Sequence, residues 1–343
     1  MSPLIRICLA LALGTAGGFC FWLLRLPLPW MLGAMLFTTT GAVAGLNLLG
    51  PNRIRPAVVA TIGVLLGSGF TPELLSKAGG LLASFALLVA YLALSAAVVI
   101  PFYRKVGKFD PITAYFSAMP GGLTEMVLIG EAAGGDGRKI ILAHAARIFV
   151  CVFVIAISFR VFFGLNIGSA GRAGFGDLSP LDAALLIAAG LIGVPIARLL
   201  RLPAPELLGP MILSAAAHLS NLTHIAPPSV LVSAAQVALG TMLGCRFVGT
   251  PAHEVGRALL LALAATILTL LVAGLAAVIA AQLSGFRTDQ IILAYAPGGL
   301  SEMSLIALAL KADVGFVAVQ HIARIVLVIG AAPLVFRLFW PAK

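Results

Sequence analysis

The chain has 343 residues, of which 61% are hydrophobic and only 10% are charged, and its mean hydropathy is +1.12. A soluble domain carries about 25% charged residues, so this composition excludes a mainly soluble protein. It predicts an all-α polytopic membrane protein with the lipid bilayer as its main partner. The net charge of +10 comes from Lys and Arg scattered in short loops, where positive charge orients membrane spans and meets anionic lipid. No basic stretch carries interleaved aromatics, so we expect no binding of nucleic acid.

In chain order, the apolar runs divide into twelve membrane-inserted segments, many of them near the length of about 20 residues that crosses a hydrocarbon core. The first run imitates a signal peptide, but it is too long and leads directly into further spans, so we expect a retained helix. The expected segments cover approximately residues 3–24, 28–49, 56–76, 79–103, 110–133, 139–165, 180–200, 204–220, 227–247, 254–284, 288–310 and 314–340.

The first six segments match the last six. Leu24–Pro29 (LRLPLP) recurs as Leu200–Pro205 (LRLPAP), and Pro120–Met126 (PGGLTEM) recurs as Pro297–Met303 (PGGLSEM), with an offset of 176 residues at the first match and 177 at the second. A duplication of this size in a polytopic chain is typical of a transporter, with the site at the repeat interface. The predicted organisation is a first membrane repeat at 1–165, a Gly-rich interrepeat loop at 166–178 and a second membrane repeat at 179–343.

The orientation of the two repeats stays open at the level of sequence. If all six segments of each half cross the membrane, the repeats are parallel; if one segment is re-entrant, five cross and the repeats are inverted. The distribution of Lys and Arg between the loops is too even for the positive-inside rule to decide. We therefore expect five or six membrane-inserted segments in each half.

The repeated PGGL[ST]EM motif predicts a broken helix in each half. Proline removes a helical hydrogen bond and glycine relaxes the backbone. Thr124 and Ser301 are candidate caps for the half-helices that follow, with Glu125 and Glu302 in the first turns. A carboxylate there either completes a helix terminus or binds a solute or ion. The glycines would open the backbone for close approach: Gly121, Gly122, Gly298 and Gly299.

A histidine follows each motif glutamate by nineteen residues, and an arginine lies three residues further on: His144 and Arg147, then His321 and Arg324. A spacing of three places both side chains on one helical face. An ionised group in such an apolar helix is costly and is normally paired or turned to a cavity. We expect each arginine to pair with a motif glutamate or to bind an anion, and each histidine to relay protons. The alternative is a structural ion pair that joins the two helices.

Several kinds of chemistry are not signalled. The chain has no phosphate-binding GxxxxGK[ST] loop, no CxxC pair and no two histidines spaced by four, so neither ATP hydrolysis nor a redox metal is expected. The four cysteines, Cys8, Cys20, Cys151 and Cys245, have no pairing pattern and are interpreted as inert core residues. We predict no catalytic residues, no metal ligands and no cofactor, and enzyme activity is not favoured.

Together, the PGGL[ST]EM segments, the HxAR segments and the LRLPxP corners resemble the AbrB-type bacterial inner-membrane family, which carries a membrane AbrB duplication domain. This family is distinct from the small soluble DNA-binding AbrB regulators. Its members are described as regulators of gene expression or as ammonia monooxygenases, and its fold looks related to secondary transporters with broken, crossing helices. The resemblance implies a multi-pass protein of the bacterial inner (plasma) membrane.

Our principal functional hypothesis is a secondary transporter or exporter of a small solute, with anions among the candidates, that uses paired Glu, Arg and His side chains at the broken helices. The first alternative is a membrane-embedded regulator that affects gene expression indirectly. The second is a membrane oxidoreductase, which the missing metal-ligand pattern disfavours. A homo-oligomer is compatible with the sequence.

Overall fold

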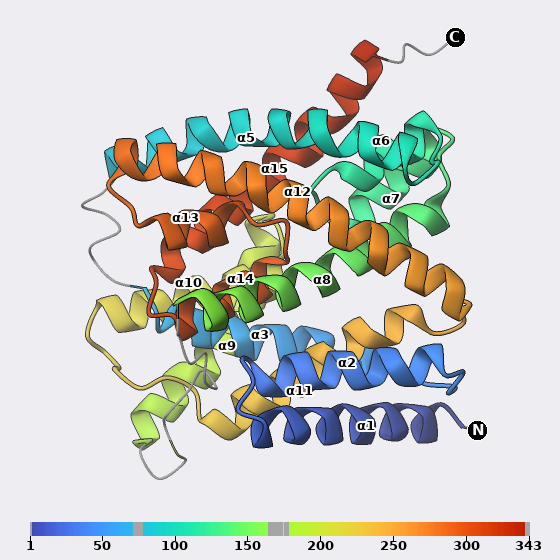
Figure 1. Ribbon diagram of the computed structural model, residues 1–343. Coiled ribbons are helices and arrows are strands. Elements are labelled where there is room, and N and C mark those ends of the chain that lie inside the picture. The colour runs from blue at the N-terminus through green and yellow to red at the C-terminus, as the bar shows by residue number, and fades with distance from the viewer. Residues whose placement is uncertain (1, 71–77, 164–173, 175–177, 340–343) are drawn as a thin grey trace. The chain divides into compact units, whose positions relative to one another are not determined.

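The computed structural model describes residues 2–70, 78–163, 174 and 178–339. Within these residues the secondary structure is helical, with no strand, which confirms the predicted all-α class (Figure 1). The helices form two compact units that we describe separately. Unit 1 comprises Met1–Leu74, Phe153–Ala252 and Ser304–Gly315, and unit 2 comprises Leu75–Val152, His253–Met303 and Phe316–Lys343.

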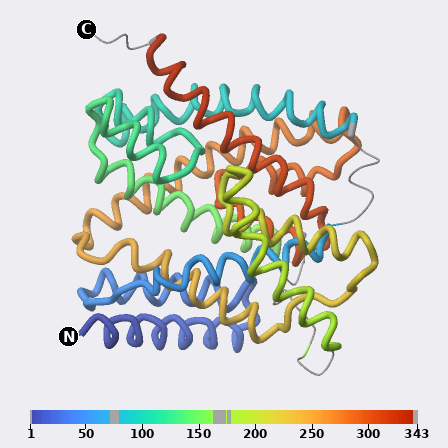
Figure 2. The backbone as a smooth tube through the Cα atoms, turned by 180° about the vertical axis from the view of Figure 1, so that it is seen from behind, coloured from blue at the N-terminus to red at the C-terminus, as the bar shows by residue number. Residues whose placement is uncertain are grey.

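Unit 1 is built around two helical hairpins, α1–α2 and α9–α10, each followed by a third helix. Its elements are α1 (Pro3–Leu23), α2 (Pro29–Val43), η1 (Asn52–Ile54), α3 (Arg55–Gly67), α9 (Pro180–Leu199), α10 (Pro205–Leu219), α11 (Ser229–Gly244) and η3 (Cys245–Phe247). In both views α1 and α2 lie side by side (Figure 1, Figure 2). The corresponding third helix of each repeat packs on the hairpin of the other: α11 contacts α2, and α3 contacts α10.

The hairpin corners arise from the two Leu-Pro-x-Pro stretches. Leu28 and Ala204 adopt left-handed backbone conformations, with φ of 43° and 46°. The prolines that follow, Pro29 and Pro205, are the first residues of α2 and α10, where the missing N–H has no helical partner to lose. The corners are therefore tight turns, as the sequence predicts.

Small residues allow the helices of unit 1 to approach closely. A Cβ on Gly33 of α2 would lie 2.2 Å from the main-chain oxygen of Gly17 in α1, and a Cβ on Gly209 of α10 would lie 2.0 Å from that of Gly193 in α9. Real Cβ contacts are never this short, so only glycine fits. Glycine at these crossings is the usual way in which helices pack in a membrane, where small residues bring the backbones together.

Unit 2 contains a long helix, a broken helix and a second long helix from each half of the chain. Its elements are α5 (Ala78–Lys105), α6 (Pro111–Ala118), α7 (Leu123–Ala132), α8 (Gly137–Phe163), α12 (Ala252–Ser284), α13 (Thr288–Tyr295), α14 (Leu300–Ala309) and α15 (Val314–Phe339). The last part of α8 and most of α14 belong to unit 1.

The equivalent helices α5 and α12 run antiparallel. A Cβ on Gly80, near the start of α5, would lie 2.0 Å from the main-chain oxygen of Ser284 at the end of α12. At the other end, Arg257 near the start of α12 donates to the main-chain oxygen of Gly107, just after α5, at 2.9 Å. Two equivalent helices of opposite direction are related by inversion, so the two repeats are inverted within unit 2.

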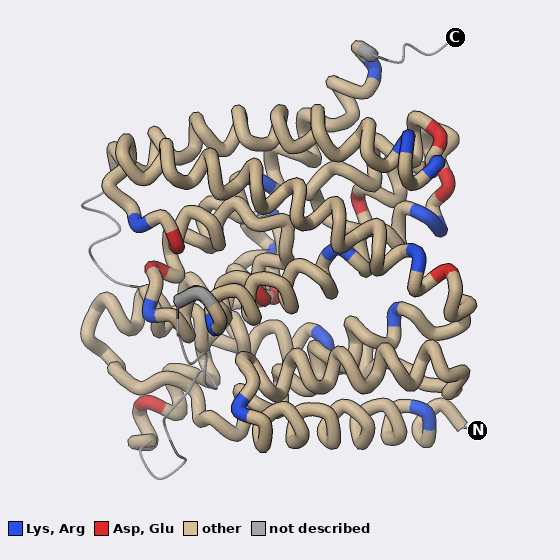
Figure 3. Tube along the Cα trace, viewed as in Figure 1, with Lys and Arg blue, Asp and Glu red and all other residues tan. Residues whose placement is uncertain are grey.

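Seven of the described helices are long and apolar enough to cross a membrane, and Figure 3 shows long stretches of them without Lys, Arg, Asp or Glu. They are Pro3–Leu23, Gly79–Lys105, Gly137–Val161, Pro180–Leu199, Ser229–Phe247, Ala252–Ser284 and Val314–Leu338.

Several expected segments are shorter than predicted. The segment expected at 28–49 ends at Val43, because Gly45 (φ 84°) closes the helix by donating to the oxygen of Ala42.

The compact units do not coincide with the predicted repeats. Unit 1 takes the first three helices of each half with the end of α8 and most of α14, and unit 2 takes the rest of the later helices. The repeat boundaries at 1–165 and 179–343 therefore remain a prediction about the ancestry of the sequence rather than about compact bodies. Most of the expected interrepeat loop at 166–178 lies outside the described residues.

Candidate functional site

All twelve candidate site residues belong to unit 2. The predicted breaks occur in both halves. Helix α6 ends at Ala118 and α7 begins at Leu123, with extended backbone at Met119 (ψ 127°) and Gly122 (ψ 134°) between them. In the second half α13 ends at Tyr295 and α14 begins at Leu300, and Ala296 is again extended (ψ 139°). The proline of each motif accounts for the break, because the residue before proline avoids the helical region.

The first motif glycine makes room for the motif methionine. A Cβ on Gly121 would lie 2.9 Å from Cγ1 of Val328 and 3.2 Å from two atoms of Met126, and a Cβ on Gly298 would lie 2.7 Å from Cε of Met303. Both methionines are fully buried. In the first half, Met126 belongs to an apolar cluster that also contains Val328 and Ala332 of α15. The broken helix of the first half is therefore packed on the last helix of the second.

The second motif glycine makes room for the motif carboxylate. A Cβ on Gly122 would lie 2.0 Å from Oε2 of Glu125, and a Cβ on Gly299 would lie 1.9 Å from Oε2 of Glu302. Each carboxylate thus folds back over the start of its own half-helix, where main-chain N–H groups are unpaired and negative charge is favoured. The same geometry in both halves explains why the motif needs two adjacent glycines and a glutamate three residues after the second.

The hydroxyl residues do not cap these half-helices in the predicted way. The N-cap of α7 is Gly122, which makes Thr124 the second helical residue. Helix α14 begins at Leu300, which gives Ser301 the same place. The backbone turns helical earlier than expected because the glycine itself supplies the extended residue before the helix. The prediction that Thr124 and Ser301 cap the half-helices is therefore wrong.

Arg147 of α8 binds the end of the first half-helix. Its side chain is 6% exposed. Nη1 donates to the main-chain oxygens of Ser117 at 3.2 Å and Met119 at 3.1 Å, and Nη2 donates to Nδ1 of His144 at 3.0 Å. The last carbonyls of a helix have no helical partner and carry the negative end of its dipole. The guanidinium group therefore satisfies the carbonyls that the break exposes.

Arg324 of α15 does the same in the second half. Its side chain is 3% exposed. Nη1 donates to the main-chain oxygen of Ala296, and Nη2 donates to that of Gly298 at 2.9 Å. Ala296 is the equivalent of Met119, since 119 plus 177 is 296. In each half, one buried arginine thus holds the carbonyls at the end of the broken helix.

The two histidines are buried but bonded differently. Nε2 of His144 lies 3.0 Å from the main-chain oxygen of Phe116, which only accepts, so Nε2 carries the proton and Nδ1 accepts from Arg147. These bonds favour a fixed neutral ring rather than the proton relay that the sequence suggests. Nδ1 of His321 lies 3.0 Å from the oxygen of Val317 in its own helix, and its Nε2 is buried with no partner in the part of the chain that the structure describes.

The expected Glu–Arg ion pairs do not form. Among the described residues, no salt bridge joins Arg147 or Arg324 to a carboxylate. Glu125 is exposed, whereas Glu302 is only 6% exposed. The arginines bond instead to carbonyls of the broken segments. The sequence could not indicate this, because every residue type has the same main-chain carbonyl acceptor.

One cysteine, interpreted from the sequence as an inert core residue, interacts electrostatically with charged groups of both halves. Cys151 of α8 is fully buried and lies within electrostatic range of Arg147, Arg324 and Glu302. The two guanidinium groups also act on each other. The sequence does contain a pattern that indicates this position for Cys151: residues 144, 147 and 151 are spaced by three and four, which places them on one helical face. Tyr91 of α5, which stacks on Tyr295 at 5.2 Å, lies near the same arginines and had no such signal.

Nε of Arg147 and Nε of Arg324 are buried and have no acceptor among the described residues. Buried donors without partners are rare in proteins and call for an explanation such as a bound ion or water. Two guanidinium groups that repel each other, keep spare donors and have no carboxylate partner in the described part of the chain are a donor set suited to an anion. Across residues 2–70, 78–163 and 178–339, no group of three or more His, Cys, Asp and Glu side chains is placed to hold a metal ion.

Long apolar helices and two broken helices whose ends are held by buried arginines define an all-α multi-pass membrane protein. Residues 30–340 match the family model described as "Transition state regulatory protein AbrB", and the chain belongs to this family. This match confirms the resemblance drawn from the repeated motifs.

Two relatives cover almost the whole chain. "Uncharacterized protein YhjN" of Bacillus subtilis (strain 168) is 26% identical over 96% of this chain and 91% of its own length. "Putative regulator AbrB" of Escherichia coli (strain K12) is 25% identical over 92% of this chain and 91% of its own length. The similarity therefore extends over nearly the full length of both relatives.

Proposed function

We propose that this protein is a secondary transporter that moves a small anionic solute across the bacterial inner membrane. The observation that carries the proposal is the pair of buried arginines in unit 2, which lack a carboxylate partner among the described residues. The solute would bind beside Arg147 and Arg324, at the level of the two breaks. In transporters with inverted repeats, half-helix ends form the binding site in this way.

The electrostatics support an anion rather than a cation. A buried charge costs several kcal/mol unless it is compensated, and main-chain carbonyls offset only part of the charge of each guanidinium. No acceptor within the described ranges uses Nε of either arginine. A small anion would accept from these groups and cancel the mutual repulsion of the two side chains.

Glu302 is the better candidate for coupling transport to a proton or cation. It is buried in the first turn of α14, while Glu125 at the equivalent position is exposed. A carboxylate near the anion site would repel the solute when ionised and admit it when a proton or cation neutralises the charge. Binding of solute and binding of the coupling ion would then favour each other.

The first experiment is a thermal-shift screen of the purified protein against sodium salts of phosphate, sulfate, nitrate, acetate, lactate and citrate. A ligand that binds only the native state raises its stability, so at least one anion should raise Tm. Arg324→Lys should remove that shift, because an ammonium group cannot hold two carbonyls and an anion in the fork geometry of a guanidinium. If no anion of this panel changes Tm, the anion site is contradicted.

The second experiment measures flux of the stabilising anion in proteoliposomes. Glu302→Gln should abolish coupled flux while the protein stays folded and monodisperse, and Glu125→Gln should have a smaller effect because Glu125 is exposed. The control is Glu131→Gln, which removes an exposed acid from α7 outside the motif. Unchanged flux in both motif variants would contradict the proposed roles of the glutamates.

A second candidate function is regulation through a partner protein, which the printed names of the family and of the Escherichia coli relative favour. The two candidate functions predict different experimental results. Transport requires flux by the purified protein alone, whereas a regulator without transport would show normal regulatory phenotypes in a strain that carries a flux-dead variant such as Glu302→Gln.

A further inference from the structure

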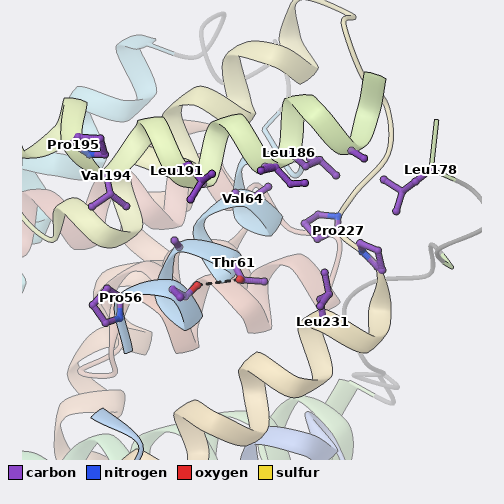
Figure 4. Close-up of a pocket in the computed structure, with 16 residues that line it drawn as sticks. Pro56, Thr61, Val64, Leu178, Leu186, Leu191, Val194, Pro195, Pro227 and Leu231 are labelled. Carbon is purple, nitrogen blue, oxygen red and sulfur yellow. Dashed lines mark hydrogen bonds between the residues drawn. The ribbon is translucent and has the colours of Figure 1, made fainter. Parts of the chain in front are cut away.

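A large apolar groove lies in unit 1, remote in sequence from the broken helices. It has a volume of about 590 Å³, and Figure 4 shows residues of α3, α9 and the start of α11 lining it. The lining is almost entirely hydrophobic and includes Pro56, Ala60 and Val64 of α3 and Ile187, Gly190 and Leu191 of α9. A groove of this size and chemistry suits a hydrocarbon chain and offers little to a polar solute.

The groove exists because the two halves of unit 1 differ. At the equivalent seam between α1 and α11, a Cβ on Gly14 would lie 2.2 Å from Oγ1 of Thr241, so that seam is closed. At the seam between α9 and α3, the nearest atom to a Cβ on Gly190 is Cγ2 of Val64, at 3.9 Å. Gly190 and Val64 are the counterparts of Gly14 and Thr241 by the repeat offsets of 176 and 177. The seam between α9 and α3 is therefore packed less tightly than its counterpart, and both Gly190 and Val64 line the groove.

The groove opens at the surface of a membrane-spanning helix. Ile187 is 60% exposed and Leu191 is 73% exposed, both on α9, which is one of the candidate spans. Leu231 at the start of α11 is 46% exposed on the other wall. The molecules in contact with such a surface are lipids, whose acyl chains match its apolar lining.

One end of the groove is positively charged. Pro56 lines it, Arg55 immediately precedes Pro56 at the start of α3, and Arg53 lies two residues before Arg55, in η1. Both arginines are exposed, and neither has a salt-bridge partner in the described part of the chain. Glu206, the carboxylate that acts electrostatically on Arg55, is already bonded to Arg198 at 2.9 Å. The free charge at this end is therefore positive.

We propose that this groove is a binding site for an anionic phospholipid, with an acyl chain along α3 and α9 and the phosphate on Arg53 and Arg55. Basic side chains beside an apolar groove between membrane helices are the combination that selects acidic lipids. A second copy of the chain fits the charge less well, because its net charge of +10 is of the same sign as the groove end.

The test compares dioleoyl phosphatidylglycerol with dioleoyl phosphatidylcholine, which has the same chains and no net charge, by lipid retention in native mass spectrometry and by Tm in detergent. Phosphatidylglycerol should be retained preferentially. Arg53→Gln/Arg55→Gln should reduce that preference by roughly tenfold or more, since each basic side chain near a headgroup contributes about 1 kcal/mol. The matched control is Arg104→Gln/Lys105→Gln, which removes the same charge from two exposed residues of α5 in unit 2.

A second variant tests the groove itself. Gly190→Leu adds a large side chain at a residue that lines the groove and should reduce retention of both lipids while the protein remains folded. A preference for phosphatidylglycerol that survives Arg53→Gln/Arg55→Gln, or that falls equally in the control, overturns the proposal. So does equal stabilisation by glycerol 3-phosphate, which would indicate a soluble phosphate ligand. A change of oligomeric state in Gly190→Leu would assign the groove to a second copy of the chain and also overturn the lipid site.

Discussion

The two glycines of each PGG motif are neighbours in sequence but serve different side chains. Gly121 and Gly298 lie against the buried methionine of their motif, whereas Gly122 and Gly299 lie against the carboxylate. The first contact is part of the apolar packing, and the second sets the position of a charge. A methyl group should therefore affect stability at the first glycine and function at the second.

Replacement of Gly299 by alanine tests this assignment. The added Cβ would occupy a point 1.9 Å from Oε2 of Glu302, so the carboxylate must move, although the backbone can stay in place because Gly299 does not have a positive φ. We expect a change in unfolding free energy below about 1 kcal/mol, as for a substitution that displaces only a flexible side-chain end. Flux in proteoliposomes should fall by about tenfold to a hundredfold, the usual cost of misplacing a functional group by an ångström.

The control for this experiment is Gly274→Ala in α12, where a Cβ would meet no atom within 4 Å. It should leave flux unchanged and slightly stabilise the helix, because alanine is a better helix former than glycine. If Gly299→Ala transports as well as Gly274→Ala, the position of the Glu302 carboxylate is not important for transport.

At the scale of elements, unit 1 depends on one small-residue motif that occurs twice. Helices α3 and α11 each carry two glycines four residues apart: Gly63 and Gly67, then Gly240 and Gly244. A Cβ on Gly63 would lie 2.5 Å from the main-chain oxygen of Leu207 in α10. A Cβ on Gly240 would lie 2.3 Å from that of Met31 in α2. The pattern is the GxxxG arrangement that lets membrane helices cross in backbone contact.

Gly67→Val should therefore disrupt unit 1. The branched side chain would meet the main-chain oxygen of Met211, which lies 2.5 Å from the position of a Cβ and cannot move aside as a side chain can. We expect a loss of at least about 3 kcal/mol, as for severe overpacking of a buried site. The measurement is detergent-solubilised thermal unfolding, with Gly190→Ala as the control because a Cβ on Gly190 would make only an ordinary contact, at 3.9 Å from Cγ2 of Val64. Equal stability of the two variants would show that α3 and α10 need no close approach.

At the scale of the whole molecule, the antiparallel pair α5 and α12 predicts opposite sidedness for equivalent loops. Lys105 ends α5, near the start of α12, whereas Arg287 lies just beyond the end of α12. Because α12 is long enough to cross the membrane, we expect single cysteines at Lys105→Cys and Arg287→Cys to be labelled from opposite sides by an impermeant maleimide. The background would replace the four native cysteines. Labelling of both positions from the same side would contradict inverted repeats.

Sequence alone determined the features that depend on local chemistry. Hydropathy predicted the membrane helices, because apolar runs of sufficient length have no other stable place. Pro-Gly-Gly predicted both breaks, because proline and glycine weaken a helix wherever they occur. The offset of 176 and 177 residues predicted two related halves. The family resemblance rested on the same repeated motifs.

Only the tertiary structure decided which groups meet. The sequence paired Arg147 and Arg324 with the motif glutamates, but the arginines bind main-chain carbonyls near residues 119 and 296. It divided the chain into consecutive halves, but each compact unit combines corresponding helices from both halves. It left the orientation of the repeats open, and the crossing of α5 with α12 resolved it. The physical reason is common to all three. Residue type sets where a helix forms and where it breaks, whereas the contacts between distant segments depend on how those segments pack. A buried arginine can bind any main-chain carbonyl, and because every residue has one, the sequence does not indicate which carbonyl it will bind.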